Sequence, residues 1–301
     1  HYSSRRQRQM CIRDSISEDA HSSFIKCIRI MGLDAANLVR IKTDNQGRMD
    51  INNLRKSLNK CLIENKKIFA IVATLGTTVR GAIDPIKEIS EICKERNIWL
   101  HIDGSIGGIF ALSSIQIEGL NNINQANSIT INPQKIIGIT KTSSLLLVAN
   151  MNTLQKTFST GLPYISSKED IVNRGEIGIQ GSRPAEVIKL WLGLRFLGLN
   201  GIEDILKSSI KRKDFFIDHI VKNKFEIYSG PLHIVSFIPK GLTAKDTDFW
   251  THSKVNELMK NNYMLSRPKF KGKYYLRVVL GNYNTKDSHI EELLRFLDAY
   301  Q

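Results

Sequence analysis

Three polar residues of reactive types follow apolar runs that have the character of buried strands. Thr78 follows "FAIVATLGT", Asp103 ends "IWLHID", and Lys135 follows "SITINPQ". Because ligand sites gather at the carboxyl ends of parallel strands, one crevice can hold all three side chains. An amine and a carboxylate in such a crevice can perform carbonyl chemistry, since the amine is a nucleophile and the carboxylate stabilises a nearby positive charge.

This pair of side chains suits pyridoxal phosphate. The lysine would form a Schiff base with the aldehyde, and the carboxylate would hold a proton on the pyridine nitrogen so that the ring accepts electrons. Each residue also has an ordinary structural role. A lysine in a turn commonly faces solvent, an aspartate at a strand end commonly caps a turn, and Thr78 can serve the sheet alone. The residue types by themselves leave both interpretations open.

Strand-like and helix-like segments alternate through the first two thirds of the chain. Strands are expected over 37–43, 67–76, 98–103, 128–132 and 143–149, and helices over 21–32, 49–60, 84–96 and 184–198. In the third of these helices we expect Asp84 as the N-cap and Pro85 at the first position. A long surface loop is expected over 161–183. The alternation predicts an α/β domain with a mainly parallel sheet.

The C-terminal third predicts a smaller α/β unit. An amphipathic helix over 202–224 leads to strands over 232–239 and 274–281, with helices over 246–261 and after Thr285. The N-terminal stretch "HYSSRRQRQMCIRDS" is basic, polar and without periodicity, which predicts a non-native or disordered tail. The expected organisation is therefore a tail over 1–15, a partial large domain over 16–205 and a small domain over 206–301.

Composition excludes several classes of protein. The 301 residues are 42% hydrophobic, as in globular proteins, and no apolar stretch is long enough to span a membrane, so we expect a cytoplasmic protein without membrane contact. The formal charge is +14, but the lysines are spread over predicted helix faces, so no nucleic-acid partner is expected. The four cysteines form no CxxC pair, and neither a metal site nor a disulfide framework is expected.

Six segments together resemble the group II pyridoxal-phosphate-dependent amino acid decarboxylases, relatives of the aromatic amino acid, histidine and glutamate decarboxylases. The resemblance extends from about Ile16 to Leu294. The segments are, in chain order, "SEDAHSSFIKCIRIMG", "ATLGTTVRGAIDPI", "IWLHIDGSIGG", "SITINPQK", "GSRPAEVIKLWLGLRFLGLNG" and "YYLRVVLGNYNT". The resemblance implies a fold type I enzyme, with an incomplete large domain that binds pyridoxal 5'-phosphate and a smaller C-terminal domain.

Roles for single residues follow from the same resemblance. It implies that Lys135 is the Schiff-base lysine and that Asp103 is the partner of the pyridine nitrogen. His21 would stack on the face of the ring, and Thr78 would support Asp103 or the ring hydroxyl. His101 shares a strand face with Asp103, and we interpret it as structural.

Other positions of the motifs would complete the cofactor site. Ser105 would lie under the ring, and Asn132 and Gln134 belong to the turn that leads to the lysine. Gln134 replaces the family's usual histidine; it can still donate a hydrogen bond to a phosphate oxygen but carries no titratable proton. The family's loop tyrosine is missing between residues 165 and 182, and Tyr164 is the nearest tyrosine.

The activity implied by the resemblance is decarboxylation of an L-amino acid to its amine and carbon dioxide, in a homodimer with the site at the subunit boundary. Two alternatives stay open. One is a lyase or oxidative deaminase of the same fold, which the missing tyrosine favours. The other is a non-catalytic fragment that acts as a binding module, because the family's phosphate-binding Gly/Ser-rich segment before His21 is absent. The sequence accordingly resembles a C-terminal fragment of a longer decarboxylase.

Overall fold

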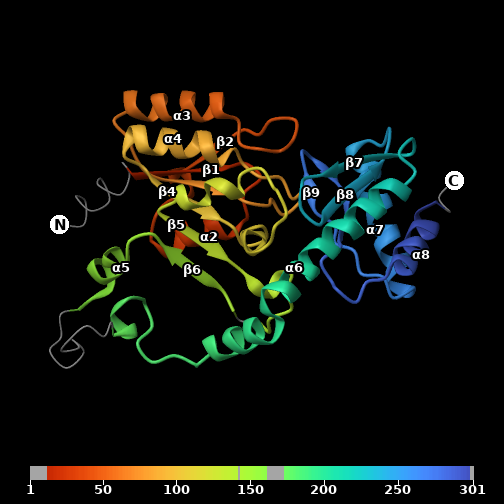
Figure 1. The fold of residues 1–301 in the computed structure, drawn as a ribbon. Coiled ribbons are helices and arrows are strands. Elements are labelled where there is room, and N and C mark those ends of the chain that lie inside the picture. Colours follow the sequence, from red (N-terminus) through yellow and green to blue (C-terminus); the bar gives the residue numbers. More distant parts are fainter. Residues whose placement is uncertain (1–11, 142, 161–172, 299–301) are drawn as a thin grey trace.

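The computed structural model describes residues 12–141, 143–160 and 173–298 of the chain. They form a larger unit around a six-stranded sheet and a smaller unit around a three-stranded sheet (Figure 1). Helix α6 (Val187–His219) runs from one unit to the other (Figure 1). The predicted α/β class, with a large domain and a smaller C-terminal one, is confirmed.

The large sheet is mainly parallel, as the sequence predicts. Its strands are β1 (Ile12–Ser17), β2 (Leu38–Ile41), β3 (Lys67–Thr74), β4 (Trp99–Asp103), β5 (Ser128–Ile131) and β6 (Leu145–Val148). They lie in the order β2-β1-β3-β4-β5-β6, and only the β5–β6 pair is antiparallel. The carboxyl ends of β1 to β5 therefore meet at one edge of the sheet.

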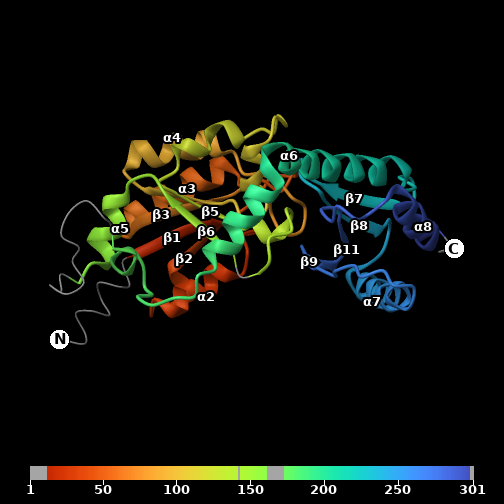
Figure 2. The same cartoon turned by 60° about the horizontal axis from the view of Figure 1, so that its bottom comes forward.

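Helices cover both faces of this sheet. Helices α3 (Ile51–Ile63) and α4 (Ile86–Arg96) pack on one face, and α2 (Ser23–Ile30) packs on the other (Figure 2). Short 3-10 turns occupy several of the connections: η1 (Ala35–Asn37), η2 (Gly108–Leu112), η3 (Leu120–Gln125), η4 (Pro133–Lys135) and η5 (Arg174–Glu176). Helix α5 (Met151–Phe158) follows β6.

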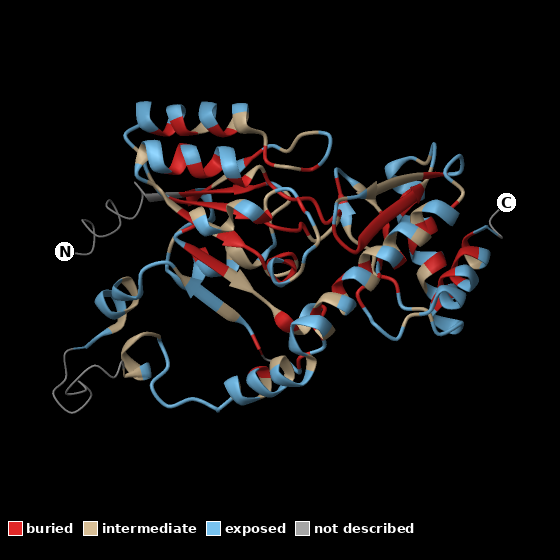
Figure 3. Cartoon of the chain, viewed as in Figure 1, coloured by how far each residue is buried: buried red, intermediate tan, exposed pale blue. Residues whose placement is uncertain are grey.

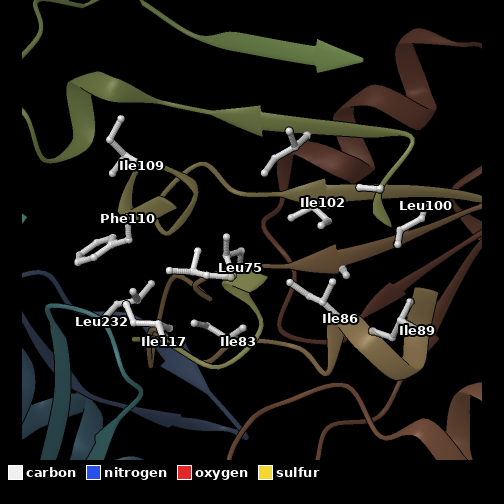
Figure 4. Close-up of a cluster of buried hydrophobic side chains, with 14 of the residues drawn as sticks. Leu75, Ile83, Ile86, Ile89, Leu100, Ile102, Ile109, Phe110, Ile117 and Leu232 are labelled. Atoms are coloured by element: carbon white, nitrogen blue, oxygen red, sulfur yellow. The ribbon is translucent and has the colours of Figure 1, made fainter. Parts of the chain in front are cut away.

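The main core lies between the sheet and helix α4. Ile102 of β4 points toward Ile86 of the helix (Figure 4), and both are at most 1% exposed. Ile71 of β3 and Ile89 of α4 are fully buried as well, and Figure 3 colours the buried stretches of the sheet red. Burial of such side chains stabilises the layer by roughly 1.5–3 kcal/mol each. Because side chains alternate along a strand, an inward Ile102 puts its neighbours His101 and Asp103 on the opposite face, which α2 covers in part.

The smaller unit has its own sheet and core. Its strands β7 (Phe225–Ser229), β8 (Ile234–Pro239) and β11 (Leu276–Val279) pair antiparallel in the order β11-β8-β7. The flanking elements are α7 (Ala244–Lys260), α8 (Asp287–Asp298) and the short pair β9 (Lys269–Phe270) and β10 (Lys273–Tyr274). Phe216 of α6 contacts Phe237 of β8 in this core, with ring centroids 5.6 Å apart.

Helix α6 replaces the two helices expected over 184–198 and 202–224. Gly198 interrupts the helical dihedrals, with φ 60° and ψ 178°, where a residue with a side chain would be strained. Beyond it, Leu206 packs into the large core and Phe216 into the small one. The domain boundary expected after residue 205 therefore falls within a helix that belongs to both units.

The N-terminal boundary also differs from the prediction. Residues 12–15, which were assigned to the tail, lie in β1, which pairs with both β2 and β3. The expected tail over 1–15 is thus corrected at its C-terminal end, because these residues complete the backbone hydrogen bonding between two neighbouring strands. Residues 1–11 lie outside the described part. In the described part, no helix has the length and apolar character needed to cross a bilayer.

Asp84 is not the cap of α4, contrary to the sequence-based expectation. Pro85 occupies the N-cap position, and the Asp84 carboxylate turns inward instead. It accepts hydrogen bonds from the backbone N–H of Met49 at 2.6 Å and of Thr74 at 2.7 Å. The buried carboxylate therefore joins the end of β3 to the segment that precedes α3.

Candidate active site

The candidate site lies at the carboxyl ends of three neighbouring parallel strands. Strand register places Asp103, the last residue of β4, between Thr74 of β3 and Thr130 of β5. Side chains of residues paired in this way share one face of the sheet. Both neighbours of Asp103 in the sheet are therefore threonines and not apolar residues.

Asp103 is nearly buried, with 9% of its surface exposed. One carboxylate oxygen accepts a hydrogen bond from the backbone N–H of Ser105 at 3.1 Å. Gly104 follows directly, and a Cβ there would lie 2.9 Å from the backbone oxygen of Thr130. A glycine is thus required for the chain to leave β4 this close to β5.

Lys135 follows β5 on a short turn. Its backbone N–H donates to the carbonyl oxygen of Asn132 at 3.0 Å, and Pro133 starts the 3-10 turn that ends at the lysine. Partial burial lowers the pKa of the Lys135 amine, Asp103 opposes this shift and Arg277 adds to it. A lower pKa increases the fraction of neutral amine, which is the nucleophilic form. Lys135 and Asp103, both predicted site residues, thus lie close enough to interact electrostatically.

Arg277 is a site residue that the sequence analysis missed. It lies on β11 of the small unit, and its Nη1 donates to the backbone carbonyl of Thr78. Its Nε donates to Ser266 Oγ at 2.8 Å, and burial lowers the pKa of its guanidinium. The one signal in the sequence was a cation within the apolar run "YYLRVVLG". A partly buried cation facing Lys135 is an anion-binding group.

The other predicted residues lie at different places around this edge. His21 is exposed at the start of α2, where its Nδ1 accepts from the Ser23 backbone N–H at 3.2 Å. Thr78 lies in the turn after β3, and its carbonyl is the acceptor for Arg277. Thr74, and not Thr78, is the threonine beside Asp103 in the sheet.

The remaining predicted residues belong to the two turns that follow β4 and β5. Ser105 contributes its N–H to Asp103, as described above. The Asn132 side-chain oxygen accepts from Ser144 Oγ at 2.5 Å. Gln134 precedes Lys135 and is half-buried. The predicted loop residue Tyr164 lies outside the described residues.

Unpartnered polar atoms test whether a cofactor fits this site. Thr74 Oγ1 and Gln134 Oε1 are buried and have no hydrogen-bond partner within the described part of the chain. Buried polar atoms normally have partners, so each of these positions can take a hydrogen bond from a ligand. An amine, a carboxylate, a cation and two free polar atoms match the aldehyde, ring nitrogen and polar substituents of pyridoxal phosphate.

Two cavities of the structure are lined by other parts of the chain and do not include Asp103 or Lys135. One of about 700 Å³ is at the N-terminus of α4 and is lined by residues that include Arg80, Asp84 and Tyr228. Another, of about 810 Å³, lies along β11 in the small unit and includes Arg277 in its lining. Neither lining contains Asp103 or Lys135, so the candidate site rests on its side chains and not on the size of a cavity.

A pyridoxal-type decarboxylase is the class of protein that this fold and these side chains define. The family model "Pyridoxal-dependent decarboxylase conserved domain" matches residues 7–238. The chain belongs to this family.

Individual relatives agree with that assignment. The chain is 30% identical over 293 residues to an aromatic-L-amino-acid decarboxylase of Bacillus atrophaeus, covering 94% of this chain and 61% of the relative. It is 28% identical over 285 residues to the mouse acidic amino acid decarboxylase GADL1, covering 88% of this chain and 52% of the relative. The chain thus spans about half to three fifths of the length of these relatives.

Solved structures share the fold. The apo form of mouse CSAD matches with a TM-score of 0.88 at 24% identity, over 96% of this chain and 63% of that one. Oryza sativa TDC with PLP and tryptamine matches with a TM-score of 0.89 at 19% identity, over 97% of this chain and 64% of that one. The two units described here are therefore arranged as in these proteins.

Proposed function

We propose that this chain carries the catalytic lysine and carboxylate of a pyridoxal-phosphate-dependent L-amino acid decarboxylase, a carboxy-lyase that releases an amine and carbon dioxide. The observation that carries the proposal is the pair formed by Lys135 and Asp103. The lysine has a lowered pKa and the carboxylate lies at the end of the neighbouring strand. The family supports the same activity.

Each side chain has a distinct part in holding the cofactor. Lys135 would bind the aldehyde carbon through Nζ, and Asp103 would accept a proton-bearing ring nitrogen as its ion-pair partner. Gln134 would donate to a phosphate oxygen. When bound, pyridoxal phosphate supplies an electron sink that stabilises the carbanion formed at the α-carbon.

Arg277 would bind the carboxylate of the amino acid. Its guanidinium faces Lys135 from the small unit and retains donors besides the Nη1 and Nε groups that contact Thr78 and Ser266. A charge-assisted hydrogen bond to a carboxylate is stronger than one to a neutral acceptor. Substrate would thus be oriented by a residue of one unit and processed by residues of the other.

A homodimer is part of the proposal. The first half of α6 exposes several large apolar side chains, among them Trp191, Phe196 and Leu199, which are 59%, 89% and 66% exposed. Exposed apolar side chains of this kind are typical of protein interfaces, and a second copy of the chain offers the same surface in return.

Light scattering tests the homodimer. Phe196→Asp should convert the dimer to a monomer at micromolar concentration. Phe249→Asp is the matched control, because Phe249 is 80% exposed on α7 of the small unit. A wild-type chain that is monomeric, or a dimer that both substitutions leave unchanged, would contradict this assembly.

Product analysis tests the activity. The purified chain is incubated with pyridoxal phosphate and a panel of aromatic and acidic L-amino acids, and carbon dioxide, amine, ammonia and aldehyde are measured. Equal amounts of amine and carbon dioxide are expected from wild type and from the control Lys156→Ala on α5, and none from Lys135→Ala. Ammonia and aldehyde as main products would show oxidative deamination instead, and product formation by Lys135→Ala would overturn the assignment of the lysine.

A further inference from the structure

We propose that His101 is a positioning residue for Asp103. Hydrogen bonds join four side chains in series, in the order Trp99, Ser128, His101 and Thr130. With each group donating to the next, the Thr130 hydroxyl has its own proton left to donate to the Asp103 carboxylate. This inference rests on the proposed function in one respect, because it takes Asp103 as the residue that binds the ring nitrogen of the cofactor. It gives His101 a part in the site that the sequence analysis did not.

The strand register builds this series of hydrogen bonds. Trp99, His101 and Asp103 are alternate residues of β4 and share one face of the sheet. On β5, Ser128 lies opposite His101 and Thr130 lies opposite Asp103. The five side chains therefore form two adjacent rows that run toward the candidate site.

The contacts within these rows are continuous. Trp99 Nε1 donates to Ser128 Oγ at 2.9 Å, and the same oxygen is 2.8 Å from His101 Nδ1. The other ring nitrogen, His101 Nε2, is 3.3 Å from Thr130 Oγ1. His101 is thus held at both nitrogens, and each contact involves a hydroxyl of β5.

The indole favours one direction for this series of hydrogen bonds. An indole N–H can only donate, so Ser128 Oγ accepts from Trp99 and has its own proton left to give. A neutral His101 ring with an unprotonated Nδ1 is the acceptor for that proton. The neutral ring consequently carries its proton on Nε2 and donates to Thr130.

A neutral imidazole is also what this environment favours. Burial lowers the pKa of His101, and the nearby Asp103 charge only partly opposes that shift. The ring therefore keeps an acceptor at Nδ1 at neutral pH, as this series of hydrogen bonds requires.

The last member of this series, Thr130, is the register partner of Asp103 on the neighbouring strand. Thr130 Oγ1 accepts from His101, which leaves its proton for another acceptor, and Asp103 is its direct neighbour across β4 and β5. A hydrogen bond from Thr130 would fix the plane of the carboxylate, whose Oδ1 already accepts from Ser105. Asp103 would then be oriented before the cofactor binds.

The tautomer of His101 is the first test, made on the chain without cofactor. Two-bond proton–nitrogen correlation spectra of the histidine rings should show His101 with its proton on Nε2. Trp99→Phe keeps the ring but removes the donor, and it should allow the Nδ1-protonated form to appear. A wild-type ring protonated on Nδ1, or charged at neutral pH, would overturn the proposal. This result does not depend on whether the chain is an enzyme.

Cofactor affinity is the second test. His101→Leu and Thr130→Val should weaken pyridoxal phosphate binding about tenfold, the usual effect of losing one hydrogen bond to a charged group. His101→Gln, which can still donate to Thr130, and Thr130→Ser should retain most of the affinity. Thermal unfolding of each cofactor-free variant shows whether the sheet has survived.

Two outcomes separate this proposal from the proposed function. If wild type binds no cofactor, the proposed function fails, and the tautomer measurement still tests the series of hydrogen bonds. If wild type binds the cofactor and a folded His101→Leu binds it as tightly as wild type does, the positioning role is wrong and His101 serves only the packing of the sheet. The same conclusion follows if a folded His101→Gln loses as much affinity as His101→Leu.

Discussion

Arg277 of the small unit donates a hydrogen bond to the backbone carbonyl of Thr78 in the large unit. This contact brings a residue from near the C-terminal end of the chain to the edge of the sheet where Asp103 and Lys135 lie. The two units therefore share the candidate site, and a change at Arg277 should affect the amino acid more than the cofactor.

Replacing Arg277 by glutamine tests whether this residue binds the amino acid and not the cofactor. Arg277→Gln should raise the KM for the amino acid about 10- to 100-fold, because a charge-assisted hydrogen bond to the substrate carboxylate is lost. The dissociation constant of pyridoxal phosphate should change less than about twofold. Arg295→Gln on the exposed side of α8 is the control. An unchanged KM in Arg277→Gln would remove the arginine from the substrate site.

A buried ion pair beside the site is expected to dominate local stability. Arg80 Nη2 lies 2.7 Å from Asp19 Oδ2, and the two side chains are 4% and 7% exposed. The guanidinium also lies over the Phe270 ring, 4.2 Å from its centroid. Arg80→Met should lower the free energy of unfolding by about 3–5 kcal/mol, because it leaves the Asp19 charge buried and unpaired.

A double variant separates the pair from its packing. Asp19→Asn combined with Arg80→Met should lower the free energy of unfolding less than Arg80→Met alone, since no uncompensated charge remains. Urea unfolding measures the free energy of unfolding of the double variant and of each single variant. A double variant that loses as much as the two single variants added together would show that the residues do not interact.

Asp14 on β1 is expected to destabilise the folded chain. Its Oδ1 is buried without a hydrogen-bond partner in the described part of the chain, and burial raises the pKa of this carboxyl from 3.8 to about 7. Asp14→Val should raise the free energy of unfolding by about 1–3 kcal/mol at neutral pH.

The pH dependence of this effect has a definite sign. Folded Asp14 holds its proton more tightly than unfolded Asp14, so its contribution to stability falls as the pH rises from about 4 to about 7. Asp14→Asn removes the titration. The stability difference between Asp14→Asn and wild type should therefore grow over this pH range, and a constant difference would contradict the raised pKa.

The sequence predicted the parts of the site that depend on local pattern. Asp103 and Lys135 each follow a recognisable apolar strand, and a parallel sheet brings such strand ends together. The order of strands, helices and the smaller unit was likewise readable from periodicity. These features depend on short stretches of chain.

The parts that the sequence could not show depend on register or on distant contacts. Only the pairing of β3 with β4 shows that Thr74 lies beside Asp103 in the sheet, and the role of Thr78 stays a prediction. Arg277 meets Thr78 across 199 positions of sequence, which no local pattern reveals. Asp84 has the sequence signature of a cap, yet its carboxylate binds two distant backbone N–H groups instead.

The central claim is that Lys135 holds the cofactor, and covalent labelling tests it most directly. The chain is incubated with pyridoxal phosphate, reduced with borohydride, digested and analysed by mass spectrometry. The account expects one stoichiometric adduct, on Lys135, and its disappearance in Lys135→Ala but not in Lys156→Ala. An adduct on another lysine, or none at all in the folded wild-type chain, would contradict it.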